Sequence, residues 1–291
     1  MASLIDLRRR LRSVKNTQQI TRAMKMVAAA KLRRAQDRAI ASRPYAKALR
    51  DVLASVSSRV TDAKHPLLAS REEKRVVLLV VAGDKGLAGA FNTNVQRAAV
   101  ALLAEKKGWE EVTLLPVGRK AVDYWKRRGR KLASSSYAGI FAKVEYAQAK
   151  EIAAYLAEEF TQDRIDAVYS ISNEFKSVIA QVVRVVKILP IARAEMAVSE
   201  APKTGAVEYI YEPDPAAILA ALLPRYLQFA IYRILLESAA AEHAARMTAM
   251  DSATKNAGDL IDALTLTYNR ARQARITKEL IEIVSGAAAL K

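Results

Sequence analysis

The sequence predicts an α/β protein in which two long terminal helices pair as an antiparallel coiled coil and carry a small mixed sheet covered by helices. The coiled coil is predicted because apolar residues recur at alternating spacings of three and four along both terminal segments. A long helix with one narrow apolar stripe can bury that stripe only against a partner helix of similar length. Strand and helix patterns alternate between these segments, which predicts the α/β part. With 291 residues, 52% of them hydrophobic, the chain can bury a substantial core in one or two domains.

The C-terminal helix is predicted to begin at Asp214. This residue is a typical N-cap, Pro215 suits the first helical turn, and Gly286 is the next clear stop signal. Pro224 should either bend the helix or separate a short helix, Ala216 to Leu223, from it. The residues expected on its apolar seam are Met247, Met250, Thr254, Ala257, Ile261, Leu264, Tyr268 and Ala271.

The N-terminal helix has the same spacing. Its polar seam residues Gln18, Thr21 and Lys25 cluster together, so the seam is locally loose there or faces something other than the partner helix. Pro44 should bend or interrupt the helix. The full seam is Leu4, Leu7, Leu11, Val14, Gln18, Thr21, Lys25, Ala28, Leu32, Ala35, Ala39, Ser42, Ala46, Leu49, Leu53, Val56 and Val60.

Between the terminal helices the pattern changes to short elements. Val76 to Ala82 is a continuous apolar run, typical of a strand buried on both faces. Two strands, Ala167 to Asn173 and Val178 to Leu189, are close enough in sequence to favour a hairpin. The other expected elements are helices at Ala90 to Lys107, Arg119 to Arg128 and Tyr146 to Thr161, a strand at Val112 to Val117, and a weak edge strand or loop at Lys131 to Ile140. The expected divisions of the chain are 1–60, 74–195 and 213–291.

Composition argues against several kinds of chemistry. The chain has no cysteine and only two histidines, His65 and His243, so thiolate sites are excluded and a histidine-based metal or catalytic cluster is not expected. No apolar run approaches the roughly 18 residues of a membrane-spanning helix. The net charge is +17, and residues 1–50 carry 14 lysines and arginines against two aspartates, giving +12. This basic helix should face an acidic protein, nucleic-acid or lipid surface, or is simply solvated.

Two features are candidates for function, and each has a simpler explanation. The loop Gly83 to Gly89 follows a strand and opens a helix, as phosphate-binding loops do. Its G-x-x-G-x-x-G spacing matches no nucleotide-binding fingerprint, so a tight turn explains it better than a nucleotide-dependent enzyme does. Arg270, Arg272 and Arg275 are either exposed basic residues or donors for carboxylates on an enclosing protein. No aromatic residue precedes Tyr45, which argues against a basic coiled coil that stacks on nucleic-acid bases.

The terminal sequences resemble one family. Arg246 to Leu290, RMTAMDSATKNAGDLIDALTLTYNRARQARITKELIEIVSGAAAL, is similar to the C-terminal signature of the gamma subunit of F-type ATP synthases, and Ile5 to Gln36 is similar to its N-terminal helix. DKGLAGAFN (Asp84 to Asn92) and YIYEPDP (Tyr209 to Pro215) agree. The resemblance implies a Rossmann-like central domain and a noncatalytic rotor shaft without catalytic residues, metal or cofactor. Such a shaft couples ion flow to ATP synthesis or hydrolysis.

The resemblance also implies partners. They are the alpha and beta subunits of the head, the epsilon subunit and the membrane c ring, with no nucleic acid and no other membrane contact. The residues that match contact positions of the family are Arg272 and Gln273 for a beta-subunit loop, Met24, Lys25 and Arg246 for the acidic lever of the beta subunit, and Tyr209 and Glu212 for the c ring. The seam already begins at Leu4, so we expect a bacterial protein on the cytoplasmic face of the inner membrane; a processed mitochondrial chain is the alternative.

Overall fold

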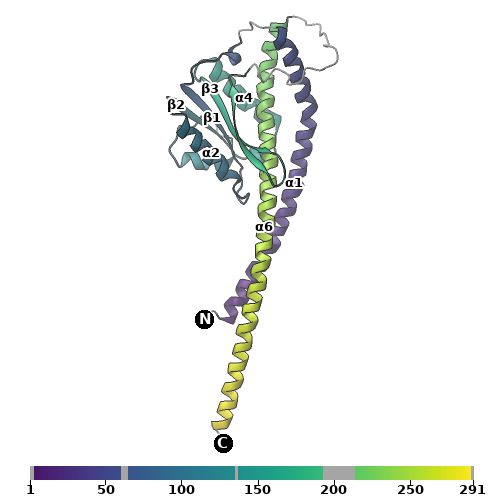
Figure 1. Ribbon diagram of the computed structural model, residues 1–291, viewed down its shortest axis with the longest axis vertical. Coiled ribbons are helices and arrows are strands. Elements are labelled where there is room, and N and C mark those ends of the chain that lie inside the picture. The colour runs from purple at the N-terminus through teal and green to yellow at the C-terminus, as the bar shows by residue number, and fades with distance from the viewer. Residues whose placement is uncertain (1–2, 60–64, 135–136, 193–213, 290–291) are drawn as a thin grey trace. The chain divides into compact units, whose positions relative to one another are not determined.

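The computed structural model describes residues 3–59, 65–134, 137–192 and 214–289 (Figure 1). Contacts divide the chain into two units. The first unit combines Met1–Ala29 with Arg246–Lys291, and the second is Ala30–Ala245. The terminal segments of the first unit therefore meet in space although they are far apart in the sequence.

Two long helices, α1 (Leu4–Arg59) and α6 (Pro215–Ala289), each have residues in both units. Both helices run through their internal prolines, so Pro44 does not interrupt α1 and Pro224 does not split α6. A proline removes one helical hydrogen bond and therefore weakens a helix locally. Next to Pro224, the side chain of Leu223 is fully buried, and this packing holds the helix together across the missing bond.

The start of α6 is the predicted one and its end is not. The Asp214 carboxylate accepts hydrogen bonds from the backbone N–H groups of Ala216, at 3.1 Å, and Ala217, at 3.4 Å. These bonds satisfy donors that the first turn of a helix leaves unpaired. The stop expected at Gly286 is wrong, because α6 continues to Ala289. Three alanines follow the glycine, and alanine is the strongest helix former.

The second unit contains a four-stranded sheet in the order β2-β1-β3-β4. The central strand β1 (Arg75–Val81) pairs in parallel with β2 (Glu111–Val117) on one side and β3 (Ala167–Phe175) on the other. β4 (Gln181–Leu189) is antiparallel to β3. The mixed sheet expected from the alternation of strands and helices is confirmed.

The expected hairpin between β3 and β4 is confirmed, but β4 begins later than Val178. The backbone N–H groups of Lys176 and Ser177 both donate to the carbonyl oxygen of Ala180. These bonds close a turn, so the chain becomes extended only at Gln181. At the other edge of the sheet, the weak strand expected at Lys131 to Ile140 is reduced, among its described residues, to isolated bridges with β2.

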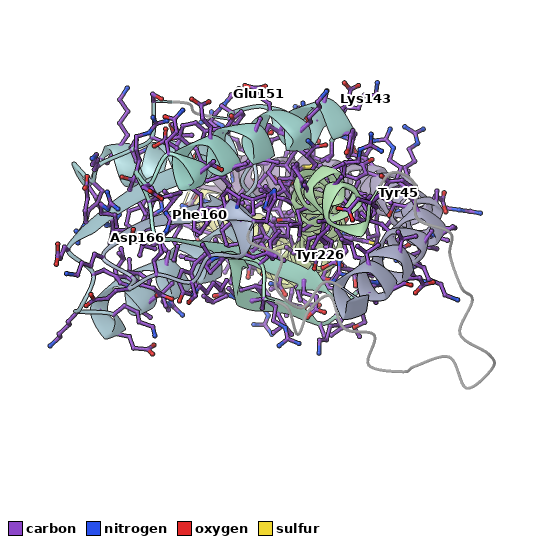
Figure 2. The ribbon with its side chains drawn as sticks, turned by 90° about the horizontal axis from the view of Figure 1, so that it is seen from above. Tyr45, Lys143, Glu151, Phe160, Asp166 and Tyr226 are labelled. Atoms are coloured by element: carbon purple, nitrogen blue, oxygen red, sulfur yellow. The ribbon has the colours of Figure 1, made fainter. Side chains whose placement is uncertain are left out.

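Helices cover both faces of the sheet. α2 (Phe91–Glu105) and α3 (Arg119–Lys126) lie on one face, and α4 (Tyr146–Thr161), which has the predicted bounds, lies on the other with parts of α1 and α6. Figure 2 shows both sides of α4: Phe160 points into the core, where it is fully buried, and Glu151 points outward. The buried residues of β1 on the α2 face are Val76, Leu78 and Val80, and those on the α4 face are Val77, Leu79 and Val81. The remaining elements are short 3-10 turns at Pro66–Leu68 and Ile140–Ala142.

Among the described helices, α6 is long and apolar enough over Ala216–Ser285 to count as a candidate membrane span by length and composition alone. The length of the apolar runs in the sequence predicts no such span. A core helix passes the same test, and Leu219, Leu223 and Leu227 of α6 are buried in the same core as strand β1. The apolar character of this part of α6 is therefore explained by packing inside the second unit.

Candidate partner-binding surfaces

The first unit is an antiparallel helix pair. The Lys25 ammonium lies 2.6 Å from the Asp251 carboxylate, and the Thr254 hydroxyl lies 2.8 Å from the Thr21 hydroxyl. Residue numbers rise along α1 while they fall along α6, so the two chain ends run in opposite directions. Every described residue predicted for either seam is buried or half-buried. The predicted heptad pattern is confirmed.

The polar stretch of the α1 seam faces α6. Thr21 and Lys25 have polar partners there, and a β-carbon at Gly258 would come within 3.2 Å of the Gln18 amide. The hydrogen bond from Lys25 lowers the pKa of Asp251 below its ordinary value, which keeps this carboxylate ionised. Polar pairs in an apolar seam fix the register of two helices at some expense of stability. Of the two alternatives for this stretch, the structure supports contact with the partner helix.

The end of α6 extends beyond this seam. Among the side chains of α6 that the structure describes, Ala271 is the last half-buried one, and residues 272–285 are all exposed. Arg272 and Gln273 therefore project outward, and neither side chain has a hydrogen bond or ion pair within the described part of the chain. Five large apolar side chains follow, with exposed fractions between 49% and 68%: Ile276, Leu280, Ile281, Ile283 and Val284. A row of exposed apolar side chains of this size is typical of a surface that another protein covers.

The glycine loop is closed by carboxylates of the chain itself. Asp84 accepts backbone N–H hydrogen bonds from Arg119 at 2.9 Å, Gly139 at 2.7 Å and Phe141 at 2.9 Å. Arg119 is the first residue of α3, so the carboxylate accepts from the amino end of α3 and not from α2, the helix that the loop opens. The side chain of Asp84 thus occupies the position of an anionic ligand.

Two close contacts leave little room around this loop. A β-carbon at Gly83 would lie 2.8 Å from the buried carboxyl group of Glu242. A β-carbon at Gly118, where φ is +88°, would lie 1.9 Å from the Ala82 carbonyl oxygen. The glycines allow the backbone and a buried side chain to approach one another. Of the two interpretations of this loop, a tight turn is therefore better supported than a phosphate-binding site. Within the described residues, no group of three or more histidines and carboxylates could hold a metal ion.

Comparison with known proteins identifies the family. Residues 3–290 match the family described as ATP synthase. An ATP synthase gamma chain from Solibacter usitatus (strain Ellin6076) is 55% identical, over 99% of this chain and 99% of its own length. Another, from Pelotomaculum thermopropionicum, is 50% identical over 100% of both chains. The chain belongs to the ATP synthase gamma-chain family.

Solved structures of mitochondrial ATP synthases agree with this fold. A chain of the Tetrahymena thermophila mitochondrial ATP synthase, described as central stalk and c ring, has a TM-score of 0.61 and 29% identity, and the match covers 80% of this chain and 99% of that one. A chain of the Euglena gracilis mitochondrial ATP synthase has a TM-score of 0.66 over 99% of this chain and 94% of that one. At 20% identity, the second likeness shows the fold alone. The predicted α/β fold with long terminal helices is confirmed.

The residues matched to gamma-chain contact positions differ in how exposed they are and in whether they have partners within the chain. Met24 is half-buried, Lys25 is half-exposed and bound to Asp251, and Arg246 is only 9% exposed. Lys25 therefore has a structural role within the seam that the sequence pattern did not reveal, and Arg246 offers a partner little exposed surface. Tyr209 and Glu212 lie outside the described residues.

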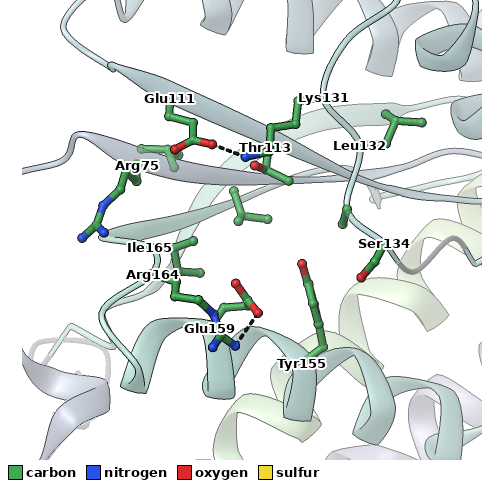
Figure 3. A pocket seen from close by; sticks show the side chains of 13 residues that line it. Arg75, Glu111, Thr113, Lys131, Leu132, Ser134, Tyr155, Glu159, Arg164 and Ile165 are labelled. Carbon is green, nitrogen blue, oxygen red and sulfur yellow. Dashed lines mark hydrogen bonds and ion pairs between the residues drawn. The ribbon is translucent and has the colours of Figure 1, made fainter.

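One pocket lies between β2, α4 and the segment after α3 (Figure 3). It has a volume of about 260 Å³, and its floor includes Val77, Leu132 and Ile165. Each cation that lines it has a carboxylate partner: Lys131 pairs with Glu111 and Arg164 with Glu159 of the lining, and Arg75 pairs with Asp166 outside it. Since each cation already has a carboxylate partner, this pocket lacks the free charge that an anionic ligand would need.

A second polar cluster lies beside the amino end of β1. Glu73 accepts hydrogen bonds from Tyr169 of β3 at 2.8 Å, Lys187 of β4 at 2.7 Å and Trp109 at 3.3 Å. Burial and the bond to Glu73 raise the pKa of Tyr169 to about 12. This network joins three parts of the sheet through one carboxylate, so its role is structural.

Proposed function

We propose that this chain is the central rotor shaft of an F-type ATP synthase, and that it does no catalysis itself. The observation that carries the proposal is the long α6 helix, which pairs with α1 along a heptad seam and then has only exposed side chains over residues 272–285. A helix end that bears an apolar row, and that has no partner among the described residues, suits a shaft enclosed by other subunits. The Tetrahymena relative, described as central stalk and c ring, supports the same position.

The proposed coupling mechanism depends on the lack of threefold symmetry in the shaft. A ring of alternating alpha and beta subunits has three catalytic sites, whereas a two-helix shaft has no threefold symmetry, so it presents a different face to each site. Turning the shaft by a third of a revolution exchanges these faces. Because each site binds nucleotide according to the face it meets, rotation changes the relative affinities of the sites. The shaft thus couples ion flow through the c ring to ATP synthesis or hydrolysis, through the face that it presents to each catalytic site.

The exposed end of α6 is proposed to contact the head. Arg272 and Gln273 are adjacent polar side chains that point outward, and the planar guanidinium of Arg272 suits a carboxylate or carbonyl of a beta-subunit loop. Met24, Lys25 and Arg246 are proposed to face the acidic lever of the beta subunit. In this arrangement Asp251 holds the Lys25 ammonium in place, which lowers the entropic cost of a second contact.

The remaining partners follow from the family. The second unit is proposed to contact the epsilon subunit and the c ring, the latter through Tyr209 and Glu212. Its glycine loop is proposed to bind no nucleotide, since its spacing matches no nucleotide-binding fingerprint and the carboxylate of Asp84 lies within it. We place the chain on the cytoplasmic face of a bacterial inner membrane, as the bacterial origin of its relatives favours. Its rigid attachment to the membrane is proposed to be through the c ring, and it needs no cofactor.

Purification from the native membrane tests the proposal. The chain should be isolated under mild detergent with alpha, beta and epsilon subunits and the c ring. Tight binding of ATP or NAD by the purified chain alone, measured by calorimetry, would instead support a nucleotide-dependent enzyme. A chain that is recovered without any of these subunits would contradict the proposed shaft.

A further inference from the structure

The ends of helices α2 and α3 carry a dense set of basic side chains. Each helix follows a parallel strand and returns antiparallel to it, so both helices end at the amino edge of the sheet. Contacts at that edge agree, because the backbone N–H groups of Glu110 and Glu111 donate to Lys74, which precedes β1. The set, here called the basic patch, consists of Lys106, Lys107, Lys126, Arg127, Arg128 and Arg130.

The basic patch is exposed and lacks acidic partners. All six side chains are exposed, and none of them forms an ion pair within the described residues. Neighbouring lysines behave differently, since Lys74 pairs with Glu110 and Lys131 pairs with Glu111. The guanidinium of Arg128 lies over the ring of Tyr124, 3.7 Å from its centroid, and is therefore held at the surface by an aromatic ring.

Helix capping does not explain so many charges. A cation near the carboxyl end of a helix is favourable, but the effect falls off within the last turn. Arg128 and Arg130 lie beyond the end of α3, and Lys107 lies beyond the end of α2. Like charges at this density repel one another unless an anionic surface is near. The patch therefore has more positive charge than the fold requires.

We propose that the basic patch binds the anionic headgroups of a lipid bilayer. The inference rests on the proposed function, which puts the second unit beside the membrane c ring. Clusters of four to eight lysines and arginines close to a membrane are typical of anionic-lipid binding, and each adds roughly fivefold to the affinity. The patch steers and steadies the shaft over the bilayer while the c ring provides the rigid attachment.

The arrangement of the cations favours a bilayer over an acidic protein. The charges are spread over the ends of two helices, and apart from Arg128 the described structure gives them no polar or aromatic partner that would fix their direction. A protein partner needs defined geometry for each charge, whereas mobile headgroups adapt to flexible lysine and arginine side chains. Screening by salt should weaken this attraction strongly, because the side chains of the patch are exposed to solvent.

Vesicle flotation with the assembled soluble complex tests the proposal. The full chain is combined with its alpha, beta and epsilon subunits, and binding is measured to phosphatidylcholine vesicles with and without one third phosphatidylglycerol. The patch variant carries Lys126→Gln, Arg127→Gln and Arg130→Gln. The matched control carries Lys85→Gln, Arg119→Gln and Lys120→Gln, which removes as many exposed charges from the carboxyl edge of the same sheet.

The unmodified complex should bind only the anionic vesicles, and high salt should release it. The patch variant should bind them at least about tenfold more weakly, and the control should change by less than about twofold. Equal losses in both variants, or no binding by an assembled complex, would overturn the proposal. Loss of epsilon binding by the patch variant with unchanged vesicle binding would assign the patch to an acidic protein surface. Failure of the complex to assemble would instead contradict the proposed function, and the inference with it.

Discussion

Lys25 of α1 and Asp251 of α6 form an ion pair of 2.6 Å across the helix seam, 226 residues apart in the sequence. Both side chains are partly exposed, at 43% and 36%, so water screens their attraction and the pair contributes little to stability. Its geometric effect is larger. Together with Thr21 and Thr254, it fixes which turns of the two helices lie side by side.

Reversing the charge at position 25 should lower coupling more than stability. Lys25→Glu puts a second carboxylate beside Asp251 and removes the cation proposed to face the beta subunit. We expect membranes with this variant to pump fewer ions per ATP hydrolysed. The exchange of partners, Lys25→Glu with Asp251→Lys, should restore thermal stability and leave pumping low, because the cation is then on the wrong helix. Full recovery of pumping in the exchanged variant would show that only the internal pair matters.

Alanine at positions 272 and 273 should affect function and spare the fold. Arg272 and Gln273 are exposed and have no partner within the described residues, so Arg272→Ala with Gln273→Ala should change the melting temperature of the chain very little. Coupled ATP synthesis should fall several-fold if these side chains hold a beta-subunit loop. Arg275→Ala is the control, since Arg275 already pairs with Glu279 at 2.8 Å. Unchanged synthesis in the double variant would remove the assignment of these residues.

Gly118 is required by both conformation and space. Gly118→Ala should destabilise the chain by more than about 3 kcal/mol, because the new methyl group would meet the Ala82 carbonyl oxygen at 1.9 Å on a backbone with φ of +88°. Gly129→Ala is the matched control. Its φ is +60°, but no atom lies within 4 Å of the new methyl group, so strain alone should destabilise by about 1 kcal/mol. Urea unfolding of both variants measures the difference, and equal losses would contradict the steric argument.

His65 titrates near neutral pH, and the fold lowers its pKa. Its Nδ1 accepts a hydrogen bond from the Leu67 N–H at 3.2 Å, which requires the neutral ring, and burial lowers the pKa of His65 below 6.5. The folded state thus binds fewer protons than the unfolded state, so the stabilising effect is complete above pH 6.5 and is lost as pH falls through the lower, folded pKa. Urea midpoints measured at decreasing pH should show this loss. His65→Asn, which caps without titrating, should flatten that part of the profile, and an unchanged profile would exclude His65 as its source.

Much of the fold follows from periodicity. The seam residues could be predicted because burial in a coiled coil repeats with the heptad, and α4 could be predicted from its amphipathic pattern. Helix ends and interruptions were harder, as Pro44, Pro224 and Gly286 show. These residues weaken a helix by amounts that surrounding packing or strong helix formers can offset, and packing is not visible in a local pattern. The division of the chain at 1–60, 74–195 and 213–291 stays a prediction.

The candidate surfaces depend on contacts between distant residues. The sequence placed Asp84 in a glycine loop, but its bonds to Gly139 and Phe141 depend on the path of the chain after α3. The pairing of Lys25 with Asp251 likewise required the register of two helices. The contact positions come from resemblance to the family and stay proposals. They are Met24, Lys25, Arg246, Arg272, Gln273, Tyr209 and Glu212. Their partners are other proteins, whose surfaces leave no periodic pattern in this chain.

Rotation of the chain inside an immobilised head tests the central claim most directly. The chain has no cysteine, so Ile179→Cys, at a side chain that is 87% exposed in the β3–β4 hairpin, gives one attachment point for a bead. With ATP supplied, the bead should turn in one direction in steps of a third of a revolution. A bead that stays fixed while the same immobilised complexes hydrolyse ATP would contradict the account.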